Sequence, residues 1–234
     1  GLVVTAHEAD CADADAVRIL RDRILATEGR VDILVNNAGV CVGGRVEDIP
    51  SDDWTWITNV NWWAAVHGVR TFLPGMIARR SGHVVNVTSM AGLLPLPGVV
   101  PYCATKAAVT ALSESLAIEV ASSGVCVTTV CTGTLKTRVL ADGRLSLPTG
   151  FRGRLLGLMA RWAPSPERAA RRIVRAVRRR RRHVRMPGEL WPLWLLRRLS
   201  MRLYVAVMAA AFGRPMRAWR TDAADAPRRP EEAR

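Results

Sequence analysis

The chain has 234 residues, enough for one domain with a sizeable core, and a formal net charge of +14. Its five cysteines show no CxxC or cysteine–histidine spacing, which excludes a zinc-finger type of site and a disulfide-built scaffold; we expect reduced, mostly buried cysteines, as in a cytoplasmic protein. The sequence opens at Gly1 inside an apolar run, so we expect a truncated or processed chain.

Apolar runs and turn residues predict alternating strands and helices along the chain. Residues 31–35 form a continuous apolar run typical of a buried parallel strand, and the apolar residues of 13–28 recur at helical spacing up to Gly29. The expected strands are residues 2–9, 31–35, 83–88, 125–130 and 183–186, the expected helices are 13–28, 51–79, 102–122 and one starting at 165, and 138–164 is an expected loop. This alternation predicts an α/β fold with a parallel sheet covered on both faces.

Tyr102 and Lys106 stand four residues apart, so in a helix their side chains share one face. A phenol one turn from an ammonium can donate a proton, because the ammonium favours phenolate and lowers the tyrosine pKa from about 10. Ser89, after strand 83–88, offers a hydroxyl that can hold the oxygen receiving the proton. The spacing alone is typical of an ordinary helix start; Ser89 and the flanking residues favour a catalytic site.

The chain resembles the short-chain dehydrogenase/reductase family over residues 1 to about 187. The matching pieces follow the family's order and spacing: Asp10 after a strand, Asn-Asn-Ala-Gly at 36–39, Val60-Asn61, Ser89, Tyr-Cys-Ala-Thr-Lys at 102–106, and Thr137 after Cys131-Thr132-Gly133. The resemblance implies a doubly wound, Rossmann-like parallel sheet, an NAD or NADP cofactor, and interconversion of an alcohol and a ketone or aldehyde.

Four catalytic residues follow from the resemblance. Tyr102 is the expected general acid in carbonyl reduction and general base in alcohol oxidation, and Lys106 is expected to lower its pKa and hold the nicotinamide ribose. Ser89 is expected to hydrogen-bond the substrate oxygen, and Asn61 to anchor a water that relays protons to Lys106. The alternative for Asn61 is a residue at a helix bend that satisfies backbone groups, which is compatible with the relay role.

The resemblance also implies a cofactor-binding set that includes Tyr102 and Lys106. Asn36, Ala38 and Gly39 would line the cofactor, where small residues let the backbone approach closely. Asp10 would meet the adenine, and Thr137 the nicotinamide carboxamide. Asn37 is expected beside the cofactor together with Asn36; the alternatives are a helix cap for Asp10 and a strand-end cap for Asn36 and Asn37.

Two departures from the family pattern bear on the cofactor. Thr132 stands where the family has proline, which predicts a looser loop over the nicotinamide. The family's opening strand, its TGxxxGxG turn, the first helix and the second strand have no counterpart before residue 2, so the fold is expected to lack its first βαβ segment. Strand 2–9 then has no neighbour and strand 31–35 becomes an edge, so we expect weak dinucleotide binding and little activity.

The C-terminal part is more basic than the rest and extends beyond the family core. Residues 1–164 hold 15 basic and 14 acidic side chains, whereas 165–234 hold 19 arginines and 6 acids. We expect a partial SDR domain at 1–187, a basic apolar helical extension at 188–221 and a disordered tail at 222–234. Arginines interrupt the apolar residues of this extension, so no run is long enough to span a bilayer. Three alternatives remain for it: an amphipathic helix on an anionic membrane, a helix docked over the substrate cleft, or a helix that packs against a partner helix.

The expected function is an NAD(P)-dependent oxidoreductase that acts on a lipophilic alcohol or ketone, because apolar residues 93–97 and the 138–164 loop would border the pocket. The tryptophans within residues 54–63 are expected in the core and in a subunit contact rather than around a cofactor. The resemblance implies that their helix, 51–79, and helix 102–122 pack across the contact of a homodimer or homotetramer. The alternative is a non-catalytic SDR-like binding or scaffold module with a basic, membrane-associating tail. The basic part has no zinc spacing, helix-turn-helix pattern or aromatic interleaving, so nucleic acid is not an expected partner.

Overall fold

The computed structural model describes residues 3–146, 163–186 and 191–224. It consists of two compact units, Gly1–Gly188 and Glu189–Arg234, each described by itself. The domain limits expected from the sequence stay predictions. Residues 222–224, expected in a disordered tail, end a helix, and 225–234 lie outside the described residues.

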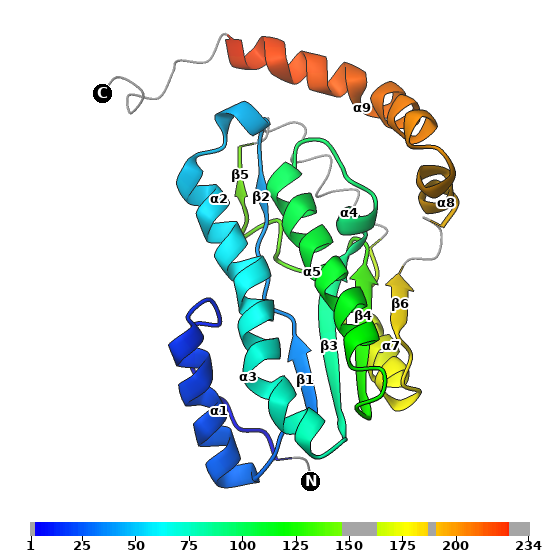
Figure 1. Cartoon of the computed structure of the whole chain (residues 1–234). Coiled ribbons are helices and arrows are strands. Elements are labelled where there is room, and N and C mark those ends of the chain that lie inside the picture. The colour runs from blue at the N-terminus through cyan, green and yellow to red at the C-terminus, as the bar shows by residue number, and fades with distance from the viewer. Residues whose placement is uncertain (1–2, 147–162, 187–190, 225–234) are drawn as a thin grey trace. The chain divides into compact units, whose positions relative to one another are not determined.

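The first unit is built on a four-stranded parallel sheet (Figure 1). Its strands are β1 (Ile33–Asn36), β3 (Gly82–Ser89), β4 (Val125–Thr132) and β6 (His183–Met186), and they pair in the order β1-β3-β4-β6. The predicted α/β parallel sheet is confirmed, with strands within three residues of the expected bounds.

Helices cover both faces of this sheet, as buried parallel strands require. Helices α3 (Ala64–Ala78) and α5 (Val100–Glu119) pack on one face through a cluster that contains Val84 of β3, and α7 (Pro166–Arg178) packs on the other through a cluster that contains Val85. Adjacent residues of a strand point to opposite faces, so β3 contributes to both clusters. This doubly covered sheet fixes the carboxyl ends of the strands, where the candidate site lies.

The expected strand at 2–9 is wrong for the described residues 3–9, which form no strand. Val3 and Val4 are 91% and 89% exposed, because a strand needs a neighbour to satisfy its backbone groups and this sheet gives them none. Helix α1 (Ala14–Glu28) follows, begun by the side chain of Asp13 and ended by Gly29 at φ 73°, as expected. It lies beside α3.

Strand β1 is the edge of the sheet, as predicted. Ile33 and Val35 are 49% and 50% exposed, so the apolar run of 31–35 is only half covered. The face of β1 that carries these two residues, which the sequence predicts to be buried, is therefore half exposed to solvent.

The expected helix 51–79 is three segments: α2 (Ser51–Thr58), a π-helical turn at Asn59–Trp63 and α3. π-turns inside helices are frequent at functional sites, and this one contains the buried Asn61. None of the tryptophans Trp54, Trp56, Trp62 and Trp63 is buried, so their expected place in the core is wrong. Trp63 is 42% exposed and stacks on His67.

Part of the expected loop 138–164 is ordered against the rest of the unit. Strand β5 (Arg144–Leu145) pairs in parallel with β2 (Val42–Gly43), and the Arg144 guanidinium lies 3.9 Å from the Trp56 ring centroid and 2.7 Å from Asp53. Residues 147–162 lie outside the described residues. The smaller helices are η1 (Val46–Asp48) and α4 (Met90–Leu93), and the second unit holds α8 (Trp191–Leu199) and α9 (Met201–Ala224).

Candidate functional site

A cavity of about 370 Å³ opens at the carboxyl ends of β1, β3 and β4. In parallel α/β sheets this edge is where ligands bind. Strand ends, the start of α5 and the loop after β4 together supply its lining, which is Asn37, Gly39, Val40, Val87, Thr88, Tyr102, Lys106, Thr132, Leu135, Thr137, Val139 and Asp142. Tyr102, Lys106, Gly39 and Thr137 were predicted from sequence, and the fold brings them to one cavity.

Tyr102 and Lys106 share one face of α5, as their spacing predicts. The Lys106 ammonium lies 5.9 Å from the centroid of the Tyr102 ring and donates a hydrogen bond to the Val87 carbonyl at 3.3 Å. Only 5% of Lys106 is exposed. A lysine this deeply buried needs a polar partner, and Val87 at the end of β3 supplies one.

The predicted lowering of the Tyr102 pKa is wrong for this structure. Burial raises the pKa of Tyr102 to about 12, since desolvation disfavours the phenolate; the Ser89 side-chain hydrogen bond opposes this rise. Burial also lowers the pKa of Lys106 to about 8, with Cys41 acting in the opposite direction. At neutral pH Tyr102 therefore carries its proton, which suits a proton donor.

Ser89 lies at the last position of β3 and begins α4. Its hydroxyl oxygen accepts a hydrogen bond from the Ala91 backbone N–H at 3.1 Å, and its side chain is close enough to Tyr102 to lower the pKa of the phenol against the effect of burial. The strand end thus holds the serine hydroxyl beside the phenol, as the sequence predicts.

Asn61, in the π-turn, has its amide engaged by the chain itself. Its Oδ1 accepts from the Val40 backbone N–H at 2.8 Å, while its Nδ2 donates to the Val40 carbonyl at 3.0 Å and to Thr105 Oγ1 at 3.1 Å. These bonds fasten the loop after β1 to α5. Asn61 therefore positions Gly39 and Val40, and its water-anchoring role stays a prediction.

Gly39 is where a side chain would collide with the site. A Cβ built there would lie 2.9 Å from Lys106 Nζ and 3.4 Å from Asn61 Oδ1. Glycine therefore lets the backbone of residue 39 approach Lys106 and Asn61 closely. Thr137 lies across the same cavity, at the start of the segment that leads to β5.

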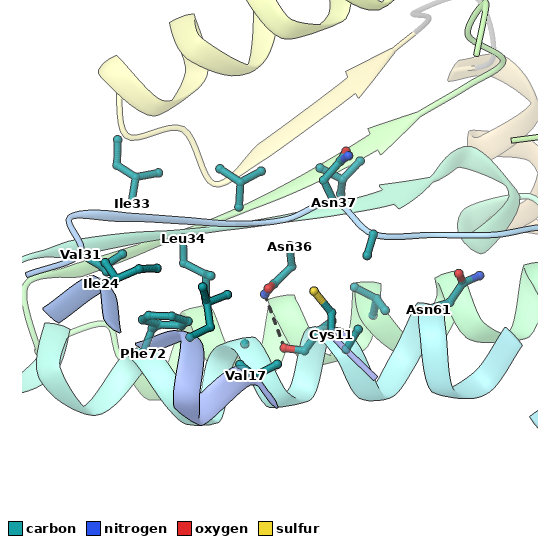
Figure 2. A pocket seen from close by; sticks show the side chains of 18 residues that line it. Cys11, Val17, Ile24, Val31, Ile33, Leu34, Asn36, Asn37, Asn61 and Phe72 are labelled. Atoms are coloured by element: carbon teal, nitrogen blue, oxygen red, sulfur yellow. Dashed lines mark hydrogen bonds between the residues drawn. The ribbon is translucent and has the colours of Figure 1, made fainter. Parts of the chain in front are cut away.

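Asn36 and Ala38 face a different hollow. They line an apolar groove of about 270 Å³ between β1, α1 and α3, with Leu34 and Phe72 among its walls (Figure 2). Asn36 Nδ2 donates to Asn86 Oδ1 at 2.7 Å and to the Ala65 carbonyl at 3.4 Å. Asn36 thus holds β1 to β3 and to α3. These bonds fit the strand-end cap expected as the alternative for Asn36 better than a position in the cavity with Tyr102.

Asp10 is not brought to the cavity. Its carboxylate accepts from the Ala12 backbone N–H at 2.8 Å in an exposed turn before α1. The N-terminus of α1 is occupied by the Asp13 carboxylate, which would repel a phosphate. The described residues therefore offer no cradle for a pyrophosphate beside this site.

Asn37 and Asp142 also line the cavity, and of these two Asp142 was missed in the sequence. Asn37, for which the Asn-Asn-Ala-Gly run offered a cofactor-lining position or a strand-end cap, reaches the cavity because it follows the last residue of β1. Asp142 lines the far wall and pairs with Arg138 at 3.1 Å; nothing in its surroundings in the sequence marks it. Within the described residues no group of three or more metal-ligating side chains occurs.

Thr132, where the chain leaves β4, is held by the sheet. Thr132 extends β4, lies opposite Ser89 in the β3–β4 register, and donates its hydroxyl to the Thr88 carbonyl at 3.2 Å. The backbone donor that proline would lack continues the strand here. Thr132 itself is held in the strand, and a looser loop after it stays a prediction.

A family model described as short chain dehydrogenase matches residues 2–146. SadH of Mycobacterium tuberculosis is 35% identical over 90% of this chain and 77% of its own length, and the oxidoreductase UcpA of Escherichia coli is 40% identical over 57% of this chain. The mouse epidermal retinol dehydrogenase 2 is 33% identical over 80% of this chain and 59% of its own length. This chain spans 30% of EphD of Mycobacterium tuberculosis, at 35% identity, and 51% of UcpA.

Solved structures show the same fold. A short-chain dehydrogenase/reductase from Burkholderia phymatum in complex with NAD superposes with a TM-score of 0.76 at 28% identity, over 83% of this chain and 75% of that one. A short-chain dehydrogenase from Streptomyces avermitilis gives 0.72 at 28% identity, over 91% and 80%.

Proposed function

Because the chain belongs to the short-chain dehydrogenase family, we propose that it is an NAD(P)-dependent oxidoreductase interconverting an alcohol and a ketone or aldehyde. The observation that carries this proposal is the meeting of Tyr102 and Lys106 in one cavity with Gly39 and Thr137. The closeness of the Ser89 side chain to the Tyr102 phenol supports it.

In carbonyl reduction, Tyr102 donates its phenolic proton to the substrate oxygen, and Ser89 holds that oxygen within reach. Alcohol oxidation reverses the transfer, with Tyr102 as the base. Lys106, whose ammonium donates to the Val87 carbonyl, would hydrogen-bond the nicotinamide ribose of a bound cofactor. Asn61 keeps the Gly39 backbone in place against Lys106.

The nicotinamide half of the cofactor fits the residues present. Lys106 Nζ, against which the backbone of Gly39 packs closely, would hold its ribose, and Thr137, which lines the same cavity, would meet the carboxamide. When bound, the cofactor supplies or takes up the hydride. Its phosphates find no cradle among the described residues, and neither Asp10 nor Asn36 faces this cavity.

We expect weak dinucleotide binding by this chain, because backbone donors at a glycine-rich turn supply much of the pyrophosphate affinity in such folds. Titration of NADH and NADPH fluorescence should give dissociation constants nearer millimolar than micromolar. Gly39→Ala should weaken the residual binding further by pressing on Lys106, whereas Gly75→Ala, whose Cβ meets only the end of Arg79 at 3.6 Å, should not. Micromolar binding by the unaltered chain would contradict the expectation.

A lipophilic substrate is the finer part of the proposal. Val40, Val87, Leu135 and Val139 give the cavity an apolar wall, and Asp142 is its one acidic lining residue. At saturating, millimolar cofactor, kcat/KM for a series of ketones should rise by about fourfold per added methylene. A panel in which only small polar carbonyls turn over would reject the lipophilic substrate.

The second candidate is a non-catalytic binding module of the same fold. Its support is the phosphate half of the site, for which the described residues hold no cradle. It predicts binding of the ketone series, measured by calorimetry, with no turnover at millimolar NADH or NADPH. We also propose a homo-oligomer and a peripheral membrane contact through the C-terminal helices.

A further inference from the structure

Helix α8 carries an exposed apolar stripe. Trp191, Leu195 and Leu199 follow one another at four-residue spacing and are 46%, 40% and 76% exposed. Trp191 stacks on Trp194 with ring centroids 4.5 Å apart, and Arg198 lies over the Trp194 ring at 5.3 Å. Large apolar side chains gathered on a surface with arginines beside them mark an interaction site.

The first two turns of α9 continue this exposure. Met201, Leu203, Val205 and Val207 are between 41% and 54% exposed, while Tyr204 is buried. Within the described part of the chain no helix is long and apolar enough to cross a membrane. The apolar side chains of α8 and α9 therefore suit a surface that is entered shallowly.

The charge on this part of the chain has one sign. From Leu190 to Thr221 the sequence holds no aspartate or glutamate and six arginines, at positions 197, 198, 202, 214, 217 and 220. Arg198 and Arg202 are exposed next to the apolar stripe. A second copy of the chain would bring the same positive charge to such a contact, whereas anionic headgroups would be attracted.

We propose that α8 and the start of α9 bind an anionic lipid surface: Trp191, Leu195 and Leu199 enter the boundary between headgroups and acyl chains, and Arg198 and Arg202 meet the headgroup charges. Tryptophan and arginine are suited to this depth, since each joins an apolar body to a polar end. The inference rests on the proposed membrane contact, for which it names the lipid class and the residues that enter the surface, and it does not depend on catalysis.

The test is sedimentation of the full chain with vesicles of phosphatidylcholine, alone or with about one third phosphatidylglycerol, at physiological salt. The unaltered chain should bind the anionic vesicles at least about tenfold more tightly than the neutral ones. Leu195→Gln/Leu199→Gln should weaken binding to the anionic vesicles about tenfold or more, because two buried leucines are lost. Arg198→Glu/Arg202→Glu should remove the preference for anionic lipid.

Each variant has a matched control in the first unit. Ile118→Gln removes an exposed apolar side chain, 76% exposed on α5, and Arg23→Glu/Arg70→Glu makes the same change in net charge at exposed positions. Circular dichroism checks that every variant keeps its helices. Unchanged vesicle binding by both C-terminal variants, or an equal loss in the controls, would overturn the proposal. So would a fall in oligomer mass for Leu195→Gln/Leu199→Gln with vesicle binding intact, since the stripe would then join two copies of the chain.

Discussion

Tyr102→Phe is expected to lower kcat/KM for ketone reduction by about 10²–10⁴-fold, because it removes the phenolic proton donor next to Ser89 while keeping the ring. The measurement is the initial rate at millimolar NADH or NADPH, so that weak cofactor affinity does not mask the loss. Tyr204→Phe is the matched control, since the chain has two tyrosines and the other lies in α9. Equal rates for Tyr102→Phe and the unaltered chain would remove Tyr102 from the reaction.

The pH dependence of the same reaction distinguishes a Tyr102 pKa that is raised by burial from one that is lowered by Lys106. With its pKa raised to about 12 by burial, the phenol is protonated over the usual range, so the rate of reduction should not fall between neutral pH and pH about 10 through loss of this proton. The rate of oxidation needs the phenolate and should rise about tenfold per pH unit over the same range. A plateau near neutral pH would mean that Lys106 and the bound cofactor overcome the effect of burial.

Features of the fold that depend on neighbouring residues in sequence could be predicted. The end of α1 at Gly29 follows from a glycine after a helical period, and β3 and β4 follow from apolar runs with turn residues on either side. Residues 3–9 have the same apolar character and form no strand, because a strand depends on a partner from elsewhere in the chain.

In the candidate site, too, features set by spacing along the chain could be predicted, whereas features set by residues distant in sequence could not. The shared face of Tyr102 and Lys106 follows from helical spacing alone. Which asparagine of 36–37 reaches the cavity depends on where β1 ends, and Asn36 is drawn instead to Asn86 on the next strand. The direction of the Tyr102 pKa depends on how deeply α5 and the strand ends bury the phenol, which no spacing reports.

Lys106→Met is expected to lower activity and raise stability at once. The folded-state pKa of Lys106 is about 8, against 10.5 for the exposed group, so below pH 8 the buried ammonium destabilises the fold by about 3 kcal/mol, and this penalty disappears as pH rises from 8 to 10.5. Methionine of similar length removes the charge but also the hydrogen bond to Val87, worth about 1 kcal/mol. A net gain of about 2 kcal/mol at pH 7 corresponds to a rise in Tm of roughly 4–8 °C.

This expectation is tested by thermal unfolding between pH 7 and pH 11. The variants are Lys106→Met and, as a control, Lys136→Met, which alters the other lysine of the chain, at an exposed position. The unaltered chain and the Lys136 variant should gain stability from pH 8 to about 10, and then lose it as pH passes the unfolded-state pKa of Tyr102, whose folded-state pKa is about 12. Lys106→Met should lack the gain and keep the loss. A buried charged residue that destabilises the fold serves function rather than stability. A Lys106→Met variant with higher stability and lower turnover would therefore support a functional role of Lys106. A Lys106→Met that is less stable at pH 7 would instead make the contact of Lys106 with Val87 a structural one.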